Sequence, residues 1–338
     1  MRMNHASSTG RVPQGRMFVA MLLALCLVAF AGCSGEVYDP SAATLSLEEG
    51  DGWLELPTET TTGAVLEIPD GDPFANAPHI LRADFLNTGE SDAILIRMDD
   101  TVILMDTGES DDYAAISGRL DEYGITVIDH LILTHFDNDH IGSAAQILQD
   151  FTVGAVYMPD YVRDSVLYRR MMGTLDLLSD TAVHRVTEDF AIGLSQGKIV
   201  ISPTELYASG LVLGSDDSHA LEENNYSLIT TVSFGEIRML FMGDAEQARL
   251  KEFMEALDGE PDYDLIKIPH HGGYDKALGD LLRGCGNLRY CVVHAEDASL
   301  VEPSLVTAMR ASGAAAYYTF GGDVRFATDG ESMVVTQE

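Results

Sequence analysis

The sequence predicts a layered α/β fold in which helices cover β-sheets. Apolar residues make up 46% of the 338 residues and charged residues 22%, so the chain can bury a large core and is not disordered throughout. Apolar runs typical of strands alternate with segments of helical spacing over the last 260 residues. Acidic and histidine side chains come directly after several of these runs. Together these three observations indicate one chemically active α/β domain.

The chain opens with a segment typical of an export signal. Three arginines precede an uncharged apolar run over residues 17–31, which is shorter than the roughly 20 residues that span a bilayer. The run ends in Ala31-Gly32-Cys33, which resembles the lipobox of bacterial lipoproteins. We therefore expect residues 1–32 to be a signal peptide and Cys33 to be lipidated. The mature protein would then be anchored to the cell membrane on its extracytoplasmic side. A cleaved signal with an incidental cysteine is the alternative.

An acidic segment separates this signal from the domain. Residues 33–78 contain ten Asp or Glu, five of the eleven prolines, and no Lys, Arg or His. A charge of one sign with few periodic apolar positions is typical of an extended tether. The sequence thus predicts a tether over residues 33–78 and a single domain over residues 79–338.

Strands are expected where apolar runs are bounded by turn-forming residues, as Asn87-Thr88-Gly89 and Asp99-Asp100 bound the first three. In chain order the predicted strands cover residues 80–86, 93–98, 102–105, 125–133, 153–158, 199–202, 227–234, 237–242, 265–268, 290–293, 316–319 and 332–336. Helices are expected where apolar residues recur every three or four positions, as at Tyr113, Ile116 and Leu120. The predicted helices cover residues 111–123, 143–148, 165–178, 245–257 and 303–312.

Four segments carrying potential metal ligands follow predicted strands. The richest holds four potential ligands within six residues, namely His135, Asp137, Asp139 and His140. A strand-to-helix junction can direct these side chains into one pocket, and two metal ions at a shared site need about this ligand density. The other three segments are centred on Asp106, on Asp244 and on the pair His270-His271. Each alone could be a turn or a helix cap, but the four together predict a metal centre.

These segments, in this order, resemble the metallo-β-lactamase superfamily and, within it, the ComEC-like hydrolase domains. The same resemblance extends to the flanking stretches at residues 84–96, 224–229, 243–246 and 269–272. It covers residues 79–338 and implies a four-layer αββα sandwich with a dinuclear metal site at one edge, between the sheets. It also implies a metal-dependent hydrolase that acts through a hydroxide activated by two divalent ions.

The resemblance assigns roles to individual residues. His135 and Asp137 would bind one ion, and Asp139, His140 and His270 would bind the other. Asp244 would bridge the ions, Asp106 would support the ligand loop, Asp139 would orient the hydroxide, and His271 would contact substrate or donate a proton.

Two points about the metals stay open. Asn225 and Ser227 lie where many members carry a further metal-binding histidine, so completeness of the first site is undecided. Zn²⁺ is the simplest ion, whereas Asp137 in place of a histidine favours a harder ion such as Mn²⁺. The free histidines of this interval, His184 and His219, are expected to be structural or solvated.

The ComEC-like resemblance implies phosphodiester substrates. Residues 79–338 contain 17 basic and 44 acidic side chains. This charge disfavours DNA, although salt screens it beyond ~8 Å. Small or envelope phosphodiesters are therefore expected. DNA would need a local basic strip, for which the candidates are Arg163, Arg169, Arg170, Lys267 and Lys276.

Other functions remain as alternatives. Residues 193–197 match the G-x-S-x-G pattern of serine hydrolases, but a β-branched strand follows them where a nucleophile elbow needs a helix. We therefore expect a hairpin turn there. A non-catalytic surface lipoprotein that binds a ligand or envelope partner, a hydrolase of non-phosphate esters, and a redox di-iron protein are the remaining candidates. The sequence also leaves open whether Cys285 and Cys291 form a disulfide.

Overall fold

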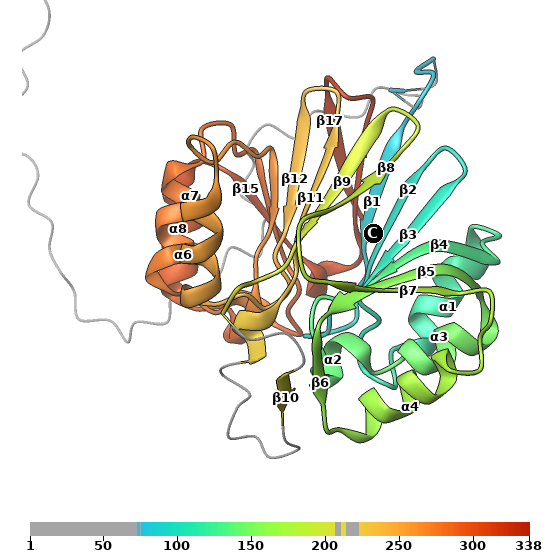
Figure 1. Cartoon of the computed structure of the whole chain (residues 1–338). Coiled ribbons are helices and arrows are strands. Elements are labelled where there is room, and N and C mark those ends of the chain that lie inside the picture. The colour runs from blue at the N-terminus through green and yellow to red at the C-terminus, as the bar shows by residue number, and fades with distance from the viewer. Residues whose placement is uncertain (1–72, 75, 207–210, 214–222) are drawn as a thin grey trace, which may run out of the picture. The chain divides into compact units, whose positions relative to one another are not determined.

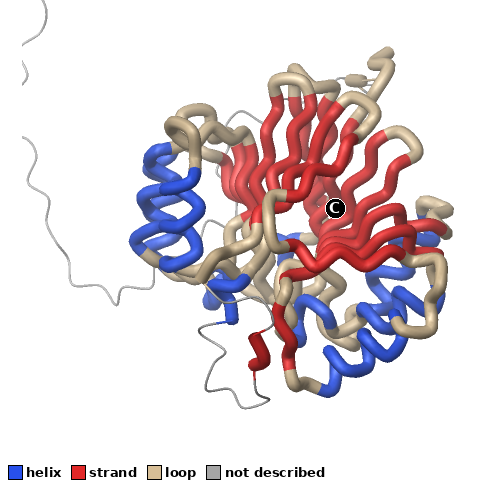
Figure 2. The backbone as a smooth tube through the Cα atoms, in the orientation of Figure 1, coloured by secondary structure: helices blue, strands red, loops and turns tan. Residues whose placement is uncertain are grey.

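The computed structural model describes residues 73–74, 76–206, 211–213 and 223–338. Within these residues two mixed β-sheets face each other, and helices cover the outer face of each sheet (Figures 1 and 2). This arrangement confirms the expected four-layer αββα fold. Cys33, the signal segment, His219 and nearly all of the tether lie outside the described residues. Each helix in the described part of the chain is too short or too polar to cross a membrane.

The first sheet contains eight strands. Their spatial order is β17 (Met333–Gln337), β16 (Val324–Thr328), β1 (Leu81–Phe85), β2 (Ile94–Met98), β3 (Thr101–Met105), β4 (Val127–Ile132), β5 (Thr152–Pro159) and β7 (Ala182–Val186). Pairing is antiparallel from β17 to β3 and parallel from β3 to β7. Parallel strands need crossover connections. The helices of these connections are α1 (Tyr113–Glu122), α2 (Asn138–Ile141), α3 (Ala144–Asp150) and α4 (Val166–Leu175).

The second sheet contains seven strands. Their spatial order is β15 (Ala315–Tyr318), β14 (Tyr290–Val293), β13 (Leu265–Lys267), β12 (Ile237–Phe241), β11 (Ile229–Phe234), β9 (Gly197–Ser202) and β8 (Phe190–Gly193). Its β12 to β15 half is parallel and its β8 to β12 half antiparallel. The crossover helices are α6 (Gln247–Ala256), α7 (Lys276–Gly284) and α8 (Pro303–Ser312). A separate pair of short parallel strands, β6 (Tyr161–Arg163) and β10 (Leu211–Leu213), lies beside the first sheet.

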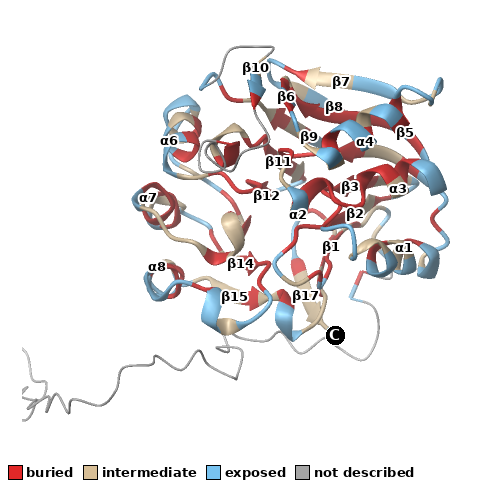
Figure 3. Ribbon diagram, turned by 90° about the horizontal axis from the view of Figure 1, so that it is seen from below, coloured by how far each residue is buried: buried red, intermediate tan, exposed pale blue. Residues whose placement is uncertain are grey.

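Three apolar layers hold the sandwich together. One lies between the two sheets, where the rings of Phe85 and Phe241 stack with their centroids 5.9 Å apart. The second lies between the first sheet and helices α1, α3 and α4, and the third between the second sheet and helices α6, α7 and α8. Figure 3 shows the buried strands flanked by helices whose outer faces are exposed. Burial of this apolar area is the main force that fixes the four layers.

The carboxyl ends of parallel strands from both sheets meet at one edge. Strands β3 and β4 end there in the first sheet, and β12, β13 and β14 end there in the second. Loops that follow parallel strands are the usual place for a site in such sheets. Every predicted ligand segment follows one of these five strands.

Several predictions about local structure can now be compared with the coordinates. Residues 193–197 form the hairpin between β8 and β9, as expected, and do not form a nucleophile elbow. His184 stacks on Tyr157 with ring centroids 4.8 Å apart, which is a structural contact. Cys285 and Cys291 are both free thiols. Sequence analysis missed strands β6, β7, β8, β10 and β16 and helices α2 and α7. Asp275 caps α7 by accepting a hydrogen bond from the Leu278 amide at 2.9 Å.

The layer between the sheets predicts the cost of a core substitution. Ile199 lies in that layer with no exposed surface, so Ile199→Ala should lower the free energy of unfolding by about 2–5 kcal/mol through the cavity it leaves. Val183→Ala is the control, because that side chain is 43% exposed and should change stability by less than ~0.5 kcal/mol. Urea unfolding followed by circular dichroism measures both. Equal losses in the two variants would contradict the assigned layer.

Candidate metal centre

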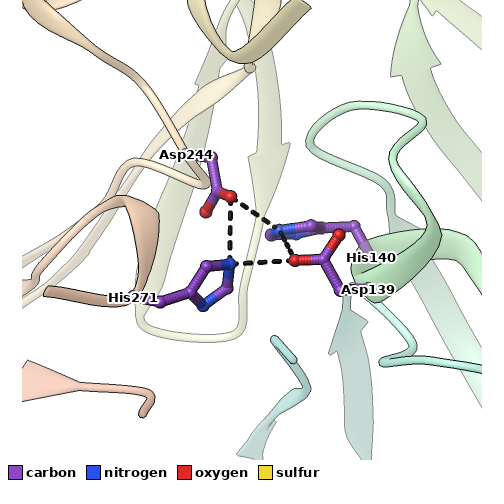
Figure 4. A group of neighbouring side chains, drawn as sticks. All are labelled: Asp139, His140, Asp244 and His271. Atoms are coloured by element: carbon purple, nitrogen blue, oxygen red, sulfur yellow. Dashed lines mark ion pairs between the residues drawn. The ribbon is translucent and has the colours of Figure 1, made fainter. Parts of the chain in front are cut away.

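Four ionisable side chains from both sheets converge at the edge where the parallel strands end. Asp139 and His140 belong to α2, Asp244 follows β12, and His271 lies in the turn after β13 (Figure 4). The Nε2 atom of His271 lies 2.9 Å from Oδ2 of Asp139 and 3.0 Å from Oδ2 of Asp244. The Nε2 atom of His140 lies 3.5 Å from Oδ2 of Asp139 and 3.2 Å from Oδ2 of Asp244. Such a His2Asp2 set matches the donors that Zn²⁺ and similar ions prefer.

The unsatisfied nitrogens of this cluster fit a metal ion. Among the described residues, the buried Nε2 atoms of His135, His140 and His271 have no hydrogen-bond partner of acceptable geometry. A buried polar atom without a partner is costly unless it binds something else. Imidazole nitrogens directed at carboxylate oxygens are typical of a metal site. The donor set therefore fits a divalent cation.

Asp106 supports the loop that carries the first ligands. It follows β3 with a left-handed backbone, φ 56°, which directs its carboxylate toward the segment that follows β4. Its oxygens accept hydrogen bonds from the Thr134 amide at 2.8 Å and the Thr134 hydroxyl at 2.7 Å. Oδ2 also lies 2.9 Å from Nδ1 of His140. A carboxylate on the far nitrogen of a ligand histidine fixes its ring orientation and tautomer, which is what the sequence led us to expect of Asp106.

Asp244 is positioned by its backbone neighbours. Gly243 adopts φ 52°, and a Cβ added there would lie 2.8 Å from the Cβ of Thr134, so only glycine fits this crossing. The Asp244 amide donates to the hydroxyl of Ser227 at 3.3 Å, and its Oδ1 accepts from the His270 amide at 3.2 Å. Ser227 thus holds the Asp244 backbone. Oδ2 of Asp244 remains directed at His140 and His271.

The side chains of the two adjacent histidines, His270 and His271, lie in different surroundings. His271, whose side chain is 11% exposed, points into the cluster, whereas the sequence assigned that position to His270. The His270 side chain is 42% exposed and its Nδ1 lies 3.3 Å from Oε1 of Glu246. Both residues have φ near 50°. Consecutive left-handed residues turn the chain sharply, and the two rings diverge, with an angle of 70° between them. His271 therefore lies within the four-residue cluster, and the His270 ring lies outside it.

His135 and Asp137 lie beside the four-residue cluster. His135 is fully buried, with its ring centroid 4.1 Å from that of His140. Its Nε2 lies 3.7 Å from Oδ2 of Asp137. The other oxygen of Asp137 lies 3.6 Å from Nη2 of Arg163. This pair can contribute two donors to a second ion.

The expected supporting residue Asn225 lies further from the cluster. Its Oδ1 accepts a hydrogen bond from the Arg249 amide at 3.0 Å, and its amide donates to Oε2 of Glu246 at 3.4 Å. Asn225 therefore holds the start of α6, which follows the Asp244 loop. It does not supply a ligand to the four-residue cluster.

Three buried residues behind the cluster were missed at the sequence level. Asp92 forms an ion pair with Lys267, and its Oδ1 lies 3.3 Å from Nδ1 of His294 and 3.9 Å from Nδ1 of His271. Lys267 also donates to the carbonyl of Gly243 at 3.2 Å. Lys267 and His294 lie at the ends of strands, and this position could have marked them as site residues. The neighbouring sequence does not show that their side chains face inward.

Two of the five residues named as candidates for a basic strip, Lys267 and Arg163, are buried. Lys267 has no exposed surface, and Arg163 is 7% exposed and paired with Glu223. Arg169 and Lys276 are exposed, but each is paired with an aspartate, Asp164 and Asp280 respectively. Two of the five candidates are therefore internal ion-pair members.

Burial and charge shift the pKa values of the cluster in opposite directions. Burial lowers the pKa of His135 to about 3. Burial also works against the charged form of His271, but the carboxylates of Asp244 and Asp139 outweigh it and raise its pKa to about 10. Burial likewise opposes ionisation of Asp244, yet the cationic His271 and His140 hold its pKa well below the usual range. Without a metal ion, protons on two histidines neutralise the buried carboxylates.

The described domain is similar in sequence to known proteins. The family profile described as "Metallo-beta-lactamase superfamily" matches residues 86–290, more than half of the chain. The chain is also similar to ComE operon protein 3 of Bacillus subtilis (strain 168), with 26% identity over 153 residues. That match covers 44% of this chain and 18% of the relative, so the chain spans less than a fifth of that protein.

Solved structures with a similar course of the chain include YhfI and CmlA. YhfI from Bacillus subtilis, a metallo-beta-lactamase fold protein, matches with a TM-score of 0.46 and 13% identity, over 71% of this chain and 95% of that chain. CmlA from Streptomyces venezuelae, a diiron beta-hydroxylase, matches with a TM-score of 0.42 and 16% identity, over 73% of this chain and 54% of that chain.

The different positions of the His270 and His271 side chains predict different metal affinities for their variants. His271→Ala removes a converging donor and should weaken binding by more than the ~10–100-fold that loss of a ligand's hydrogen-bond partner costs. His270→Ala should leave the affinity nearly unchanged, because that ring faces Glu246. Competition with a chromogenic chelator measures both constants, with His184→Ala as a folded control. The reverse order of effects would show that His270 is the ligand.

The raised pKa of His271 predicts that protons compete with the metal. Below a pKa of about 10 the metal-free ring carries a proton that binding must displace, so affinity should rise with pH. The expected slope between about pH 6 and pH 8 is roughly tenfold per pH unit for each displaced proton. Calorimetric titration in buffers of different ionisation enthalpy counts the released protons. An affinity independent of pH would be inconsistent with protonated ligands.

Proposed function

Because the chain belongs to the metallo-beta-lactamase superfamily, we propose that it is a metal-dependent hydrolase that cleaves phosphodiesters outside the cytoplasm. The observation that carries this proposal is the convergence of Asp139, His140, Asp244 and His271 from loops of both sheets. The carboxylate-rich donor set accommodates Zn²⁺ or Mn²⁺, and His135 with Asp137 offers a place for a second ion.

The roles of the cluster residues differ with the exposure of their side chains. A bound divalent ion would supply Lewis acidity, which makes water more acidic and neutralises charge on a phosphoryl oxygen. The side chain of His140 is fully buried and that of Asp244 is 4% exposed, so these two residues would hold the ion in place. The Asp139 side chain is 27% exposed and can reach a water molecule at the mouth of the site. Asp139 is therefore positioned to orient the attacking water and to accept its proton.

The charge of the domain supports a small or envelope phosphodiester over long DNA. Acidic side chains outnumber basic ones 44 to 17 over residues 79–338, and Lys267 and Arg163 are internal. A duplex must bring many phosphates against this surface, whereas a small diester brings one charge. The resemblance to ComEC-like hydrolase domains supports the choice of phosphodiesters over lactams.

The location rests on the N-terminal sequence. The short apolar run that ends at Cys33, followed by an acidic tether, supports a lipid anchor that holds the domain outside the cell membrane. The protein would then contact the membrane through its lipid anchor, and phosphodiesters of the cell envelope would be within reach of the tethered site.

Asp139 provides the direct test of the reaction. Asp139→Asn keeps the size of the side chain but removes its basicity, so turnover of bis-(p-nitrophenyl) phosphate should fall by ~10²–10⁴-fold. Asp189→Asn is the matched control, because Asp189 is exposed and distant in the chain from the ligand loops. Chelation should abolish activity reversibly, with Zn²⁺ or Mn²⁺ restoring it. If the metal-loaded protein cleaves a carboxylic ester or a lactam but no phosphodiester, the proposed substrate class is wrong.

The anchor is tested by fractionation. Cys33→Ser removes the lipidation site and should move the protein from the membrane fraction to the soluble extracytoplasmic fraction, with loss of acyl label. The control is Cys26→Ser, which changes a cysteine inside the apolar run and should leave the anchor intact. A Cys33→Ser protein that stays membrane-bound and acylated would disprove the lipobox interpretation.

A further inference from the structure

The two possible metal positions are unequal in protein donors. One is surrounded by two histidines and two carboxylates, namely Asp139, His140, Asp244 and His271. The other offers Nε2 of His135 and Oδ2 of Asp137, which lie 3.7 Å apart. Asn225 and Ser227 do not complete it, because the Asn225 carbonyl accepts from the Arg249 amide and the Ser227 hydroxyl accepts from the Asp244 amide.

A fixed positive charge also lies at the weaker position. Arg163 ends β6 with a side chain that is 9% exposed, and its Nη2 lies 3.6 Å from Oδ1 of Asp137. Its Nη1 forms an ion pair with Glu223, whose side chain is fully buried. Glu223 in turn accepts a hydrogen bond from the Tyr161 hydroxyl at 2.7 Å. The guanidinium is therefore held at the Asp137 carboxylate by a second, buried carboxylate.

This cation competes with a metal ion for Asp137. An arginine does not give up its proton, so its charge persists at every physiological pH. A divalent ion that uses Oδ2 of Asp137 must share that carboxylate with the guanidinium on Oδ1. In a buried setting salt screens the resulting repulsion only weakly. An anion that enters the site offsets it, and a phosphodiester is such an anion.

We propose that Arg163 makes the second metal position dependent on substrate. The Asp139, His140, Asp244 and His271 position holds a resident ion, and a second ion binds at His135 and Asp137 together with a phosphodiester anion. Arg163 acts here as a positioning residue, through Asp137. This inference rests on the proposed function for the nature of the anion, but its metal stoichiometry can be measured without turnover.

Counting bound Mn²⁺ tests the inference. Free Mn²⁺ is measured by electron paramagnetic resonance during titration of the metal-free full-length protein, with and without diethyl phosphate as the anion. The wild type should bind one equivalent tightly and a second at least about tenfold more weakly, and diethyl phosphate should tighten only the second. Arg163→Met should bind the second equivalent tightly without the anion.

Two further variants keep the test decisive. Arg163→Met leaves Glu223 buried without its cation and could lose the fold, so Arg163→Met with Glu223→Gln removes both charges and should bind the second ion equally well. Arg169→Met removes an exposed arginine paired with Asp164 and should titrate like the wild type.

Three results would overturn the inference. The first is a wild type that binds two equivalents of Mn²⁺ with equal affinity. The second is a wild type whose affinity for the second equivalent does not rise with diethyl phosphate. The third is an affinity for the second equivalent that is the same in the wild type and in the folded Arg163 variants. Failure of the proposed function would be a separate result. In that case Mn²⁺ binding would differ between the wild type and the Arg163 variants as described, but the protein would cleave no phosphodiester.

Discussion

The contact on which the rest of the site depends is the approach of Nε2 of His271 to the carboxylates of Asp139 and Asp244 at about 3 Å. Asp139 follows a strand of the first sheet, and His271 and Asp244 follow strands of the second, so this contact joins the two halves of the sandwich. Without a metal ion it is an ion pair whose buried carboxylates are matched by protons on His271 and His140. A divalent cation can replace both protons at the same place.

Backbone conformations that most residues avoid bring these donors together. Asp106, Gly243 and His271 all have φ between 50° and 56°, and each lies in the segment that follows a strand. Left-handed residues reverse the chain within one or two positions, which keeps the donors at the strand ends instead of carrying them away on the following helix. Non-glycine residues at such angles cost stability, and hydrogen bonds such as those from Thr134 to Asp106 offset that cost.

Sequence alone predicted the layers and most strands, because apolar periodicity reports which face of an element is buried. It also found every segment that lines the site, since each follows an apolar run. It did not find which of His270 and His271 faces inward, because that depends on two successive left-handed residues in a turn with no periodicity. It missed Asp92 and Lys267 for another reason: these two residues are about 175 positions apart in the chain, and only the folded sandwich brings them together.

Anomalous diffraction at the zinc edge tests the central claim most directly. The account predicts the strongest peak between Nε2 of His140, Nε2 of His271 and the carboxylates of Asp139 and Asp244, at roughly 2.0–2.2 Å from each donor. A peak bound by His270 and Glu246, with no density among those four side chains, would contradict it.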